Sequence, residues 1–182
     1  HSDVTMALLD RVVNEWDIQK AFSGNSRVIE YFDEECQLLI TARYNAGDSC
    51  QIMYPDNGAA HKYGAGPKDI IGFKKRNAGG RIESYELNNF VEGTKTVFLV
   101  DDIISYGGTV VSAAKELRKR GVEHIYVCVT HCEPNIYKGE VCDYVDKVFT
   151  TDSILDPGKD YEGYTKEKAD KIVFLRSWRK SK

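Results

Sequence analysis

The sequence lacks any apolar run long enough to cross a membrane. It also lacks a strong charge of either sign, since its 182 residues carry a formal net charge of −3. That balance gives no electrostatic reason to expect binding to nucleic acid or to a membrane surface. No internal repeat, low-complexity tract or dividing linker is visible. These absences predict one globular domain with a substantial core.

The cysteines are few and are not arranged for cross-linking. The sequence holds five of them, an odd number without close paired spacing, which argues against a disulfide framework. We therefore expect reduced thiols and a cytoplasmic protein. Cys128, His131 and Cys132 together could contact a zinc ion, but a fourth ligand and a suitable loop are missing.

The stretch from Thr96 to Glu123 predicts a strand, an acidic turn, a glycine turn and a helix. The continuous apolar run from Val97 to Val100 is typical of a central strand that is covered on both faces. The run ends at Asp101 and Asp102, and ligands of open α/β sheets lie at that end of the strands. A helix with apolar residues at helical spacing follows from Thr109 and stops at Gly121.

The glycine turn has the features of a phosphate site. Its glycines permit positive φ and close backbone approach, and free amides at a helix N-terminus favour an anion. The two aspartates would repel that anion, but they suit sugar hydroxyls or a metal ion. A sugar phosphate suits both features, because its phosphate fits the glycine turn and its hydroxyls fit the aspartates. An ordinary P-loop needs a lysine that is absent here. The alternative is a structural turn with an acidic edge. The predicted phosphate-binding residues are Ser105, Tyr106, Gly107, Gly108 and Thr109.

Two earlier segments carry further candidate residues. A short strand from Gln51 to Tyr54 is followed by Asp56, which either caps the next helix or serves the site. A strand from Asp69 to Phe73 leads into a basic, glycine-containing segment from Lys74 to Arg81. Such a segment is usually a solvated loop, but it also has the composition of a mobile lid that closes over phosphate charge.

The remaining elements alternate between strands and helices. This alternation predicts a doubly wound, mainly parallel α/β sheet with helices on both faces. The expected helices are His1 to Phe22 and Tyr137 to Val145; the expected strands are Arg27 to Phe32, Glu83 to Asn88, Ile125 to Val129, Lys147 to Thr150 and Lys171 to Trp178, with a loop from Asp152 to Gly163.

The segment VFLVDDIISYGGT resembles the ribose-phosphate binding signature of the type I phosphoribosyltransferase superfamily. Within that superfamily, the chain is most similar to the C-terminal half of the ribose-phosphate pyrophosphokinase family. Four further blocks are similar to the family's segments in the same order: IMYPDNGAAHKY (Ile52 to Tyr63), GFKKRN (Gly72 to Asn77), HIYVCVTHC (His124 to Cys132) and VFTTDSI (Val148 to Ile154).

The resemblance implies an enzyme domain that transfers diphosphate from Mg-ATP to ribose 5-phosphate and makes phosphoribosyl pyrophosphate (PRPP). It implies that Asp101 and Asp102 hold the ribose hydroxyls, that the glycine turn holds the 5-phosphate, and that Lys74 and Arg76 are catalytic. It also implies a longer two-domain protein that forms a homo-oligomer through both domains, and an isolated chain with little or no activity. The Mg²⁺ ligands implied are Asp56 and His1.

The chain also departs from the family pattern. Ser105 and Tyr106 stand where the family's loop usually carries Asp and Thr, and Ala59 replaces a glycine. Because serine cannot act as a carboxylate base, the first departure argues against a transferase that acts on a base. Two alternatives stay open: a PRPP-dependent phosphoribosyltransferase, and a non-catalytic regulatory homologue that binds ribose phosphate.

Overall fold

One seven-stranded sheet organises the part of the chain that the structure, a computed structural model, describes: residues 49–63, 65–79 and 82–174. The strand order is β3-β2-β1-β4-β5-β6-β7, and every neighbouring pair is parallel except β2 and β3. The sheet therefore confirms the predicted fold class. The strands are β1 Cys50–Tyr54, β2 Ile70–Arg76, β3 Ile82–Asn88, β4 Thr96–Ile104, β5 His124–Cys132, β6 Lys147–Thr150 and β7 Ile172–Phe174.

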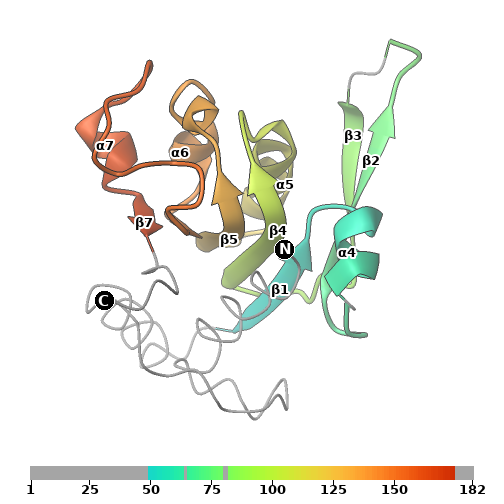
Figure 1. Cartoon of the computed structure of the whole chain (residues 1–182). Helices are drawn as coiled ribbons and strands as arrows, with labels where there is room; N and C mark the ends of the chain where they lie inside the picture. Colours follow the sequence, from blue (N-terminus) through green and yellow to red (C-terminus); the bar gives the residue numbers. More distant parts are fainter. Residues whose placement is uncertain (1–48, 64, 80–81, 175–182) are drawn as a thin grey trace.

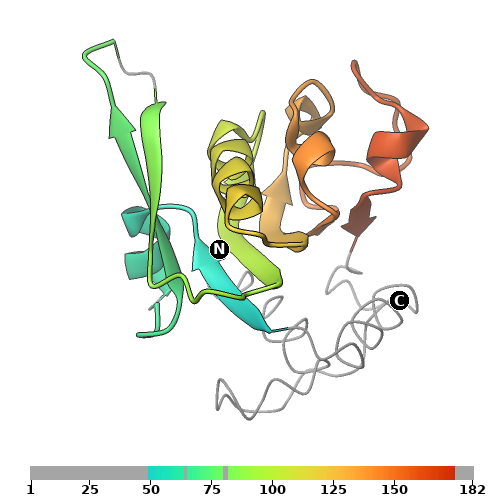
Figure 2. The same ribbon diagram turned by 180° about the vertical axis from the view of Figure 1, so that it is seen from behind.

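Short helices connect these strands. They are α4 Asn57–Tyr63, α5 Gly108–Lys119, the 3-10 helix η1 Pro134–Tyr137, α6 Val141–Tyr144 and α7 Lys166–Ala169. The chain leaves β1 through α4 toward β2 on one side, and leaves β4 through α5 toward β5 on the other. Because crossovers between parallel strands are right-handed, α4 and α5 cover opposite faces of the sheet, as Figures 1 and 2 show.

The strand order thus reverses between β1 and β4. In open α/β sheets, ligands bind in the crevice outside the carboxyl ends of the strands at such a point. Met53 of β1 pairs with Leu99 of β4. Asp56 and Asp102 therefore lie equally far along the sequence from this pair. The fold therefore brings the carboxylates that follow β1 and those that end β4 to one edge.

The core lies between the sheet and α5. This helix buries the apolar side chains expected at helical spacing, and Gly121 has a φ of 82° just after its end. On the sheet, Phe98 stacks on Tyr126 with ring centroids 5.4 Å apart. No helix in the described ranges is long and apolar enough to cross a membrane. The buried residues of α5 are Val110, Val111, Ala113, Ala114 and Leu117.

Several element boundaries differ from the sequence predictions. Strand β4 continues through Asp101 and Asp102 to Ile104 because its ladder with β5 extends to Cys132. Strand β2 likewise continues through Lys74 to Arg76, paired with β3, so the basic loop begins later than predicted. The four-residue α7 was missed, since it is too short to show a periodicity. The predicted helix over 1–22, the strand over 27–32 and the end of the last strand lie outside the described residues.

Candidate functional site

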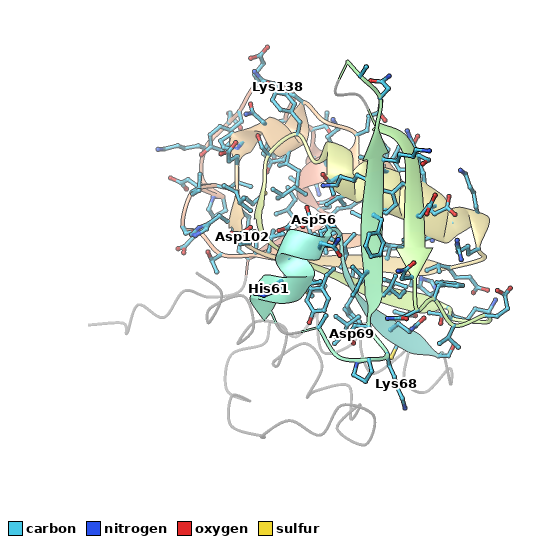
Figure 3. The ribbon with its side chains drawn as sticks, turned by 90° about the vertical axis from the view of Figure 1, so that its right-hand side faces the viewer. Asp56, His61, Lys68, Asp69, Asp102 and Lys138 are labelled. Carbon is cyan, nitrogen blue, oxygen red and sulfur yellow. The ribbon has the colours of Figure 1, made fainter. Side chains whose placement is uncertain are left out.

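The carboxylate pair of β4 lies half-buried at the switch point. Asp101 Oδ1 accepts a hydrogen bond of 2.9 Å from the backbone N–H of Asp102. Burial raises the pKa of Asp101 to about 7, and the neighbouring carboxylates of Asp102 and Asp56 add to the rise while the backbone bond opposes it. Asp56 and Asp102 are labelled in Figure 3. The site therefore collects negative charge from two adjacent strands.

Asp56 uses both of its carboxylate oxygens. Oδ1 accepts the backbone N–H of Ala59 at 2.9 Å, which is the predicted helix cap, and Oδ2 accepts Lys74 Nζ at 3.1 Å. Burial alone would raise the pKa of Asp56, but the bonds from Ala59 and Lys74 outweigh it and leave the pKa below its usual value. The Lys74 side chain is 14% exposed. Lys74 thus lies within β2 beside Asp56, largely buried, and not in the solvated loop that its basic neighbourhood suggests.

Tyr85 closes this corner of the site and was missed in the sequence. It lies opposite Lys74 in the β2–β3 ladder, and its hydroxyl donates to the carbonyl oxygen of Pro55 at 2.6 Å. A Cβ on Gly72 would lie 2.0 Å from that hydroxyl, so glycine is required for the approach. Burial raises the pKa of Tyr85, as do the charges of Asp56 and Asp101. Tyr85 could have been predicted only from the register of the β2–β3 hairpin, which the sequence alone does not determine.

The glycine turn precedes α5 as predicted. Gly107 caps the helix with a φ of 73°, and its carbonyl oxygen accepts the N–H of Val111 at 2.9 Å. This left-handed conformation favours glycine and directs the chain from β4 into the helix. Ser105 and Thr109 are partly buried, whereas the Tyr106 side chain is 55% exposed.

Residues from the η1–α6 segment contact the first three residues of this turn, and sequence reasoning missed them. Asn135 Nδ2 donates to Ser105 Oγ at 3.2 Å. A Cβ on Gly139 would lie 2.3 Å from the carbonyl oxygen of Tyr106, and one on Gly107 would lie 2.0 Å from Val141 Cγ2. The first three residues of the turn are therefore packed against this segment.

Two lysines hold that supporting segment in turn. Lys168 Nζ donates to the carbonyl oxygens of Tyr137 and Gly139, and Lys171 Nζ donates to those of Cys142 and Val145. These bonds tie the chain near the turn to α7 and to the start of β7. The segment that packs against the glycine turn is thus itself fixed by these lysine bonds.

The structure describes only some of the predicted metal ligands, Asp56 and His1, and of the second predicted catalytic residue, Arg76, only the backbone. The backbone of Arg76 ends β2, and His1 lies outside the described residues. Within the described ranges, no group of three or more His, Cys, Asp or Glu side chains could hold a metal ion, so the zinc alternative at Cys128 is not supported. Among the described residues, Cys50, Cys128, Cys132 and Cys142 form no disulfide.

A magnesium ion nevertheless suits the chemistry of Asp56. Mg²⁺ often keeps several waters and takes one or two carboxylates together with substrate phosphates. The Oδ2 atom of Asp56 already faces a cation, the Lys74 ammonium, at 3.1 Å. Asp56 is thus a carboxylate that accommodates positive charge at the switch point.

Comparison with known proteins places these features in a family. The model of the phosphoribosyl transferase domain matches residues 61–161, more than half of the chain. A ribose-phosphate pyrophosphokinase of Thermococcus kodakarensis is 38% identical over 113 residues, which cover 58% of this chain and 36% of the relative. Another of Methanopyrus kandleri is 30% identical over 146 residues, 71% of this chain and 49% of the relative.

The matches cover the relatives only in part. A third ribose-phosphate pyrophosphokinase, of Pyrococcus furiosus, is 32% identical over 120 residues, 59% of this chain and 42% of the relative. Among solved structures, phosphoribosylpyrophosphate synthetase from Mycobacterium smegmatis matches with a TM-score of 0.48 and 19% identity, over 77% of this chain and 45% of that one. The chain therefore spans between about a third and half of the length of these relatives.

Proposed function

The chain belongs to the phosphoribosyl transferase domain family, and from this premise we propose that it is the ribose 5-phosphate-binding half of a ribose-phosphate pyrophosphokinase. The complete protein would transfer diphosphate from Mg-ATP to the anomeric hydroxyl of ribose 5-phosphate and release AMP. The names of three relatives support this activity over the two alternatives. The chain would be the C-terminal domain of a longer, oligomeric, cytoplasmic protein.

One observation carries the proposal. The carboxylates of Asp101 and Asp102, the glycine turn at Gly107 and the Asp56–Lys74 ion pair all lie at the carboxyl ends of β1, β2 and β4. A sugar phosphate needs hydroxyl acceptors, an anion site and a neighbouring cation, and the carboxylates, the N-terminus of α5 and Lys74 support such a site here. A structural turn with an acidic edge would not account for a half-buried lysine beside it.

The residues would divide the chemistry as follows. The carboxylates of Asp101 and Asp102 accept hydrogen bonds from the vicinal ribose hydroxyls and so orient the sugar. The turn from Ser105 to Thr109 binds the 5-phosphate with backbone N–H groups and hydroxyls, aided by the α5 dipole. Lys74 offsets charge on the transferring diphosphate, with Arg76 as its expected partner. Such transfers depend mainly on positioning and charge neutralisation.

Magnesium would be held by Asp56 and would neutralise the phosphate oxygens of ATP. Arg76 and His1 keep their expected roles as predictions. The departure at Ser105 leaves a hydroxyl that can donate to phosphate and removes a carboxylate that a base phosphoribosyltransferase would use. This favours diphosphate transfer over transfer to a base.

Calorimetric titration of ribose 5-phosphate, with and without Mg²⁺, tests the proposal. We expect binding that is lost in the double variant Asp101→Asn, Asp102→Asn. The matched control is Glu92→Gln with Glu123→Gln, which removes two exposed carboxylates before the amino ends of β4 and β5. Unchanged binding in the aspartate variant, or equal loss in the control, would refute the assigned sugar site.

Activity gives a second test. Since the chain covers less than half of each of these relatives, we expect little PRPP formation from ATP by this chain alone. A nucleobase that releases pyrophosphate from PRPP in the presence of the chain would instead identify a phosphoribosyltransferase. Ribose 5-phosphate binding without either reaction, even in the full-length protein, would identify a regulatory homologue.

A further inference from the structure

We infer that Asp56 is a positioning residue for Lys74, whose ammonium group it holds at the switch point of the sheet. The inference rests on the proposed function, because Lys74 is the cation expected to meet the transferring diphosphate. It differs from a metal-binding role for Asp56 in that it requires no metal ion.

The first argument is the geometry of the ion pair. Lys74 Nζ and Asp56 Oδ2 are 3.1 Å apart, and the lysine side chain is 14% exposed, whereas that of Asp56 is 43% exposed. A surface lysine in solvent samples many rotamers, and holding it in one of them costs side-chain entropy. In this structure the pair and the burial have already restricted the side chain. The ammonium group is thus held in place ahead of the reaction.

The second argument is that both partners stand on fixed backbone. Lys74 lies within β2 and pairs with Tyr85 of β3, and the Tyr85 hydroxyl donates to Pro55, the residue before Asp56. On the other side, Asp56 Oδ1 accepts the N–H of Ala59 at the start of α4. One carboxylate oxygen of Asp56 thus accepts the Ala59 N–H, and the other accepts Lys74 Nζ. The Tyr85–Pro55 bond ties the β2–β3 hairpin to the residue before Asp56.

The third argument concerns the sign of the local charge. Asp102 and Asp56 both act electrostatically on Asp101, so this edge of the sheet without Lys74 would repel a diphosphate. Removal of the Asp56 charge should on electrostatic grounds alone strengthen the binding of an anion. If Asp56 positions Lys74, the same removal should weaken that binding, because the lysine would regain its freedom. The two roles thus predict effects of opposite sign.

The experiment measures PRPP and ribose 5-phosphate affinities by calorimetry in EDTA, so that no metal ion contributes. We expect Asp56→Asn and Lys74→Met each to weaken PRPP binding about fivefold to tenfold, and the double variant to be no weaker than Lys74→Met alone. Ribose 5-phosphate affinity should change less than twofold, because it lacks the diphosphate. The matched control is Lys75→Met, which removes the same charge from the exposed neighbour of Lys74 and should leave PRPP affinity within twofold.

Further variants keep the test decisive. Asp56→Glu retains the carboxylate and should restore part of the lost PRPP affinity, and thermal unfolding of each variant shows whether it is folded. PRPP binding by Asp56→Asn that equals or exceeds that of the wild type would overturn the inference, as would additive losses in the double variant. If the unmodified chain did not bind ribose 5-phosphate, the result would refute the proposed sugar site itself and not only the inference about Asp56.

Discussion

Replacement of Gly107 by alanine tests how the glycine turn is built. Gly107 has a φ of 73°, which non-glycine residues adopt at a cost of about 1–2 kcal/mol. A Cβ there would also lie 2.0 Å from Cγ2 of Val141, whose side chain is fully buried. Overpacking of this kind costs about 1–3 kcal/mol. We therefore expect Gly107→Ala to lower the free energy of unfolding by about 2–5 kcal/mol.

Two other glycines, one at the start of α5 and one just after its end, separate these contributions. Gly121 shares the positive φ, at 82°, but nothing lies within 4 Å of its Cβ position, so Gly121→Ala should cost only about 1–2 kcal/mol. Gly108 begins α5 without positive φ and without neighbours at its Cβ position. Gly108→Ala should therefore leave stability unchanged or slightly raised, because alanine is the better helix former.

The assay is urea unfolding of the three variants, followed by calorimetry with ribose 5-phosphate. We expect the losses of stability to rank Gly107→Ala above Gly121→Ala above Gly108→Ala, and weakened ligand binding in the first. The reasoning would be refuted if Gly107→Ala were no more destabilising than Gly121→Ala. In that case the packing of Val141 against the turn would not determine its shape.

Three further predictions concern the surroundings of the site. Because the pKa of Asp101 is raised to about 7 in the folded chain, its ionisation should lower stability as pH rises from about 4 to about 7, and Asp101→Asn should lack this decline in urea unfolding across that range. Gln51→Leu should cost about 2–4 kcal/mol by thermal unfolding, because the buried Gln51 amide accepts from Val91 and Thr94 and donates to two carbonyl oxygens. Gly139→Ala should weaken ribose 5-phosphate binding at least threefold, because its Cβ would displace the backbone of the turn.

Each of these has a contrary outcome that is easily recognised. An unchanged slope of stability against pH in Asp101→Asn would show that another group titrates in this range. A loss below about 0.5 kcal/mol in Gln51→Leu would show that water replaces the lost partners. Unaltered ligand binding in Gly139→Ala would mean that the turn adjusts without its support.

The sequence predicted the parts of the site that follow one another along the chain. The apolar run, the aspartates, the glycines and the helical spacing after Thr109 are local signals, and each corresponds to β4, the turn or α5. The position of Asp56 beside this stretch also followed, because α/β alternation places strand ends at one edge. These predictions needed only the order of the elements.

The residues that sequence reasoning missed act through contacts between distant segments. Tyr85 reaches Pro55 because of the register of the β2–β3 hairpin, and Gly139 meets Tyr106 because η1 and α6 fold back onto the turn. Lys74 was expected in a loop because its basic neighbourhood is typical of loops, but pairing with β3 extends the strand past it. Composition cannot show such pairing, because register is set by the tertiary fold.

The structure also bears on the departures at Ser105 and Tyr106. A bulky tyrosine in a tight glycine turn would be hard to accommodate if its side chain had to pack there, but that side chain is 55% exposed, and it is the backbone that meets Gly139. Ser105 keeps its hydroxyl within 3.2 Å of Asn135 Nδ2, so the position retains a polar contact that orients it. Both departures therefore leave the path of the turn intact, since its shape depends on Gly107 and on the packed segment behind it. The shape of a phosphate turn depends on its backbone, and that backbone can be kept while individual side chains vary.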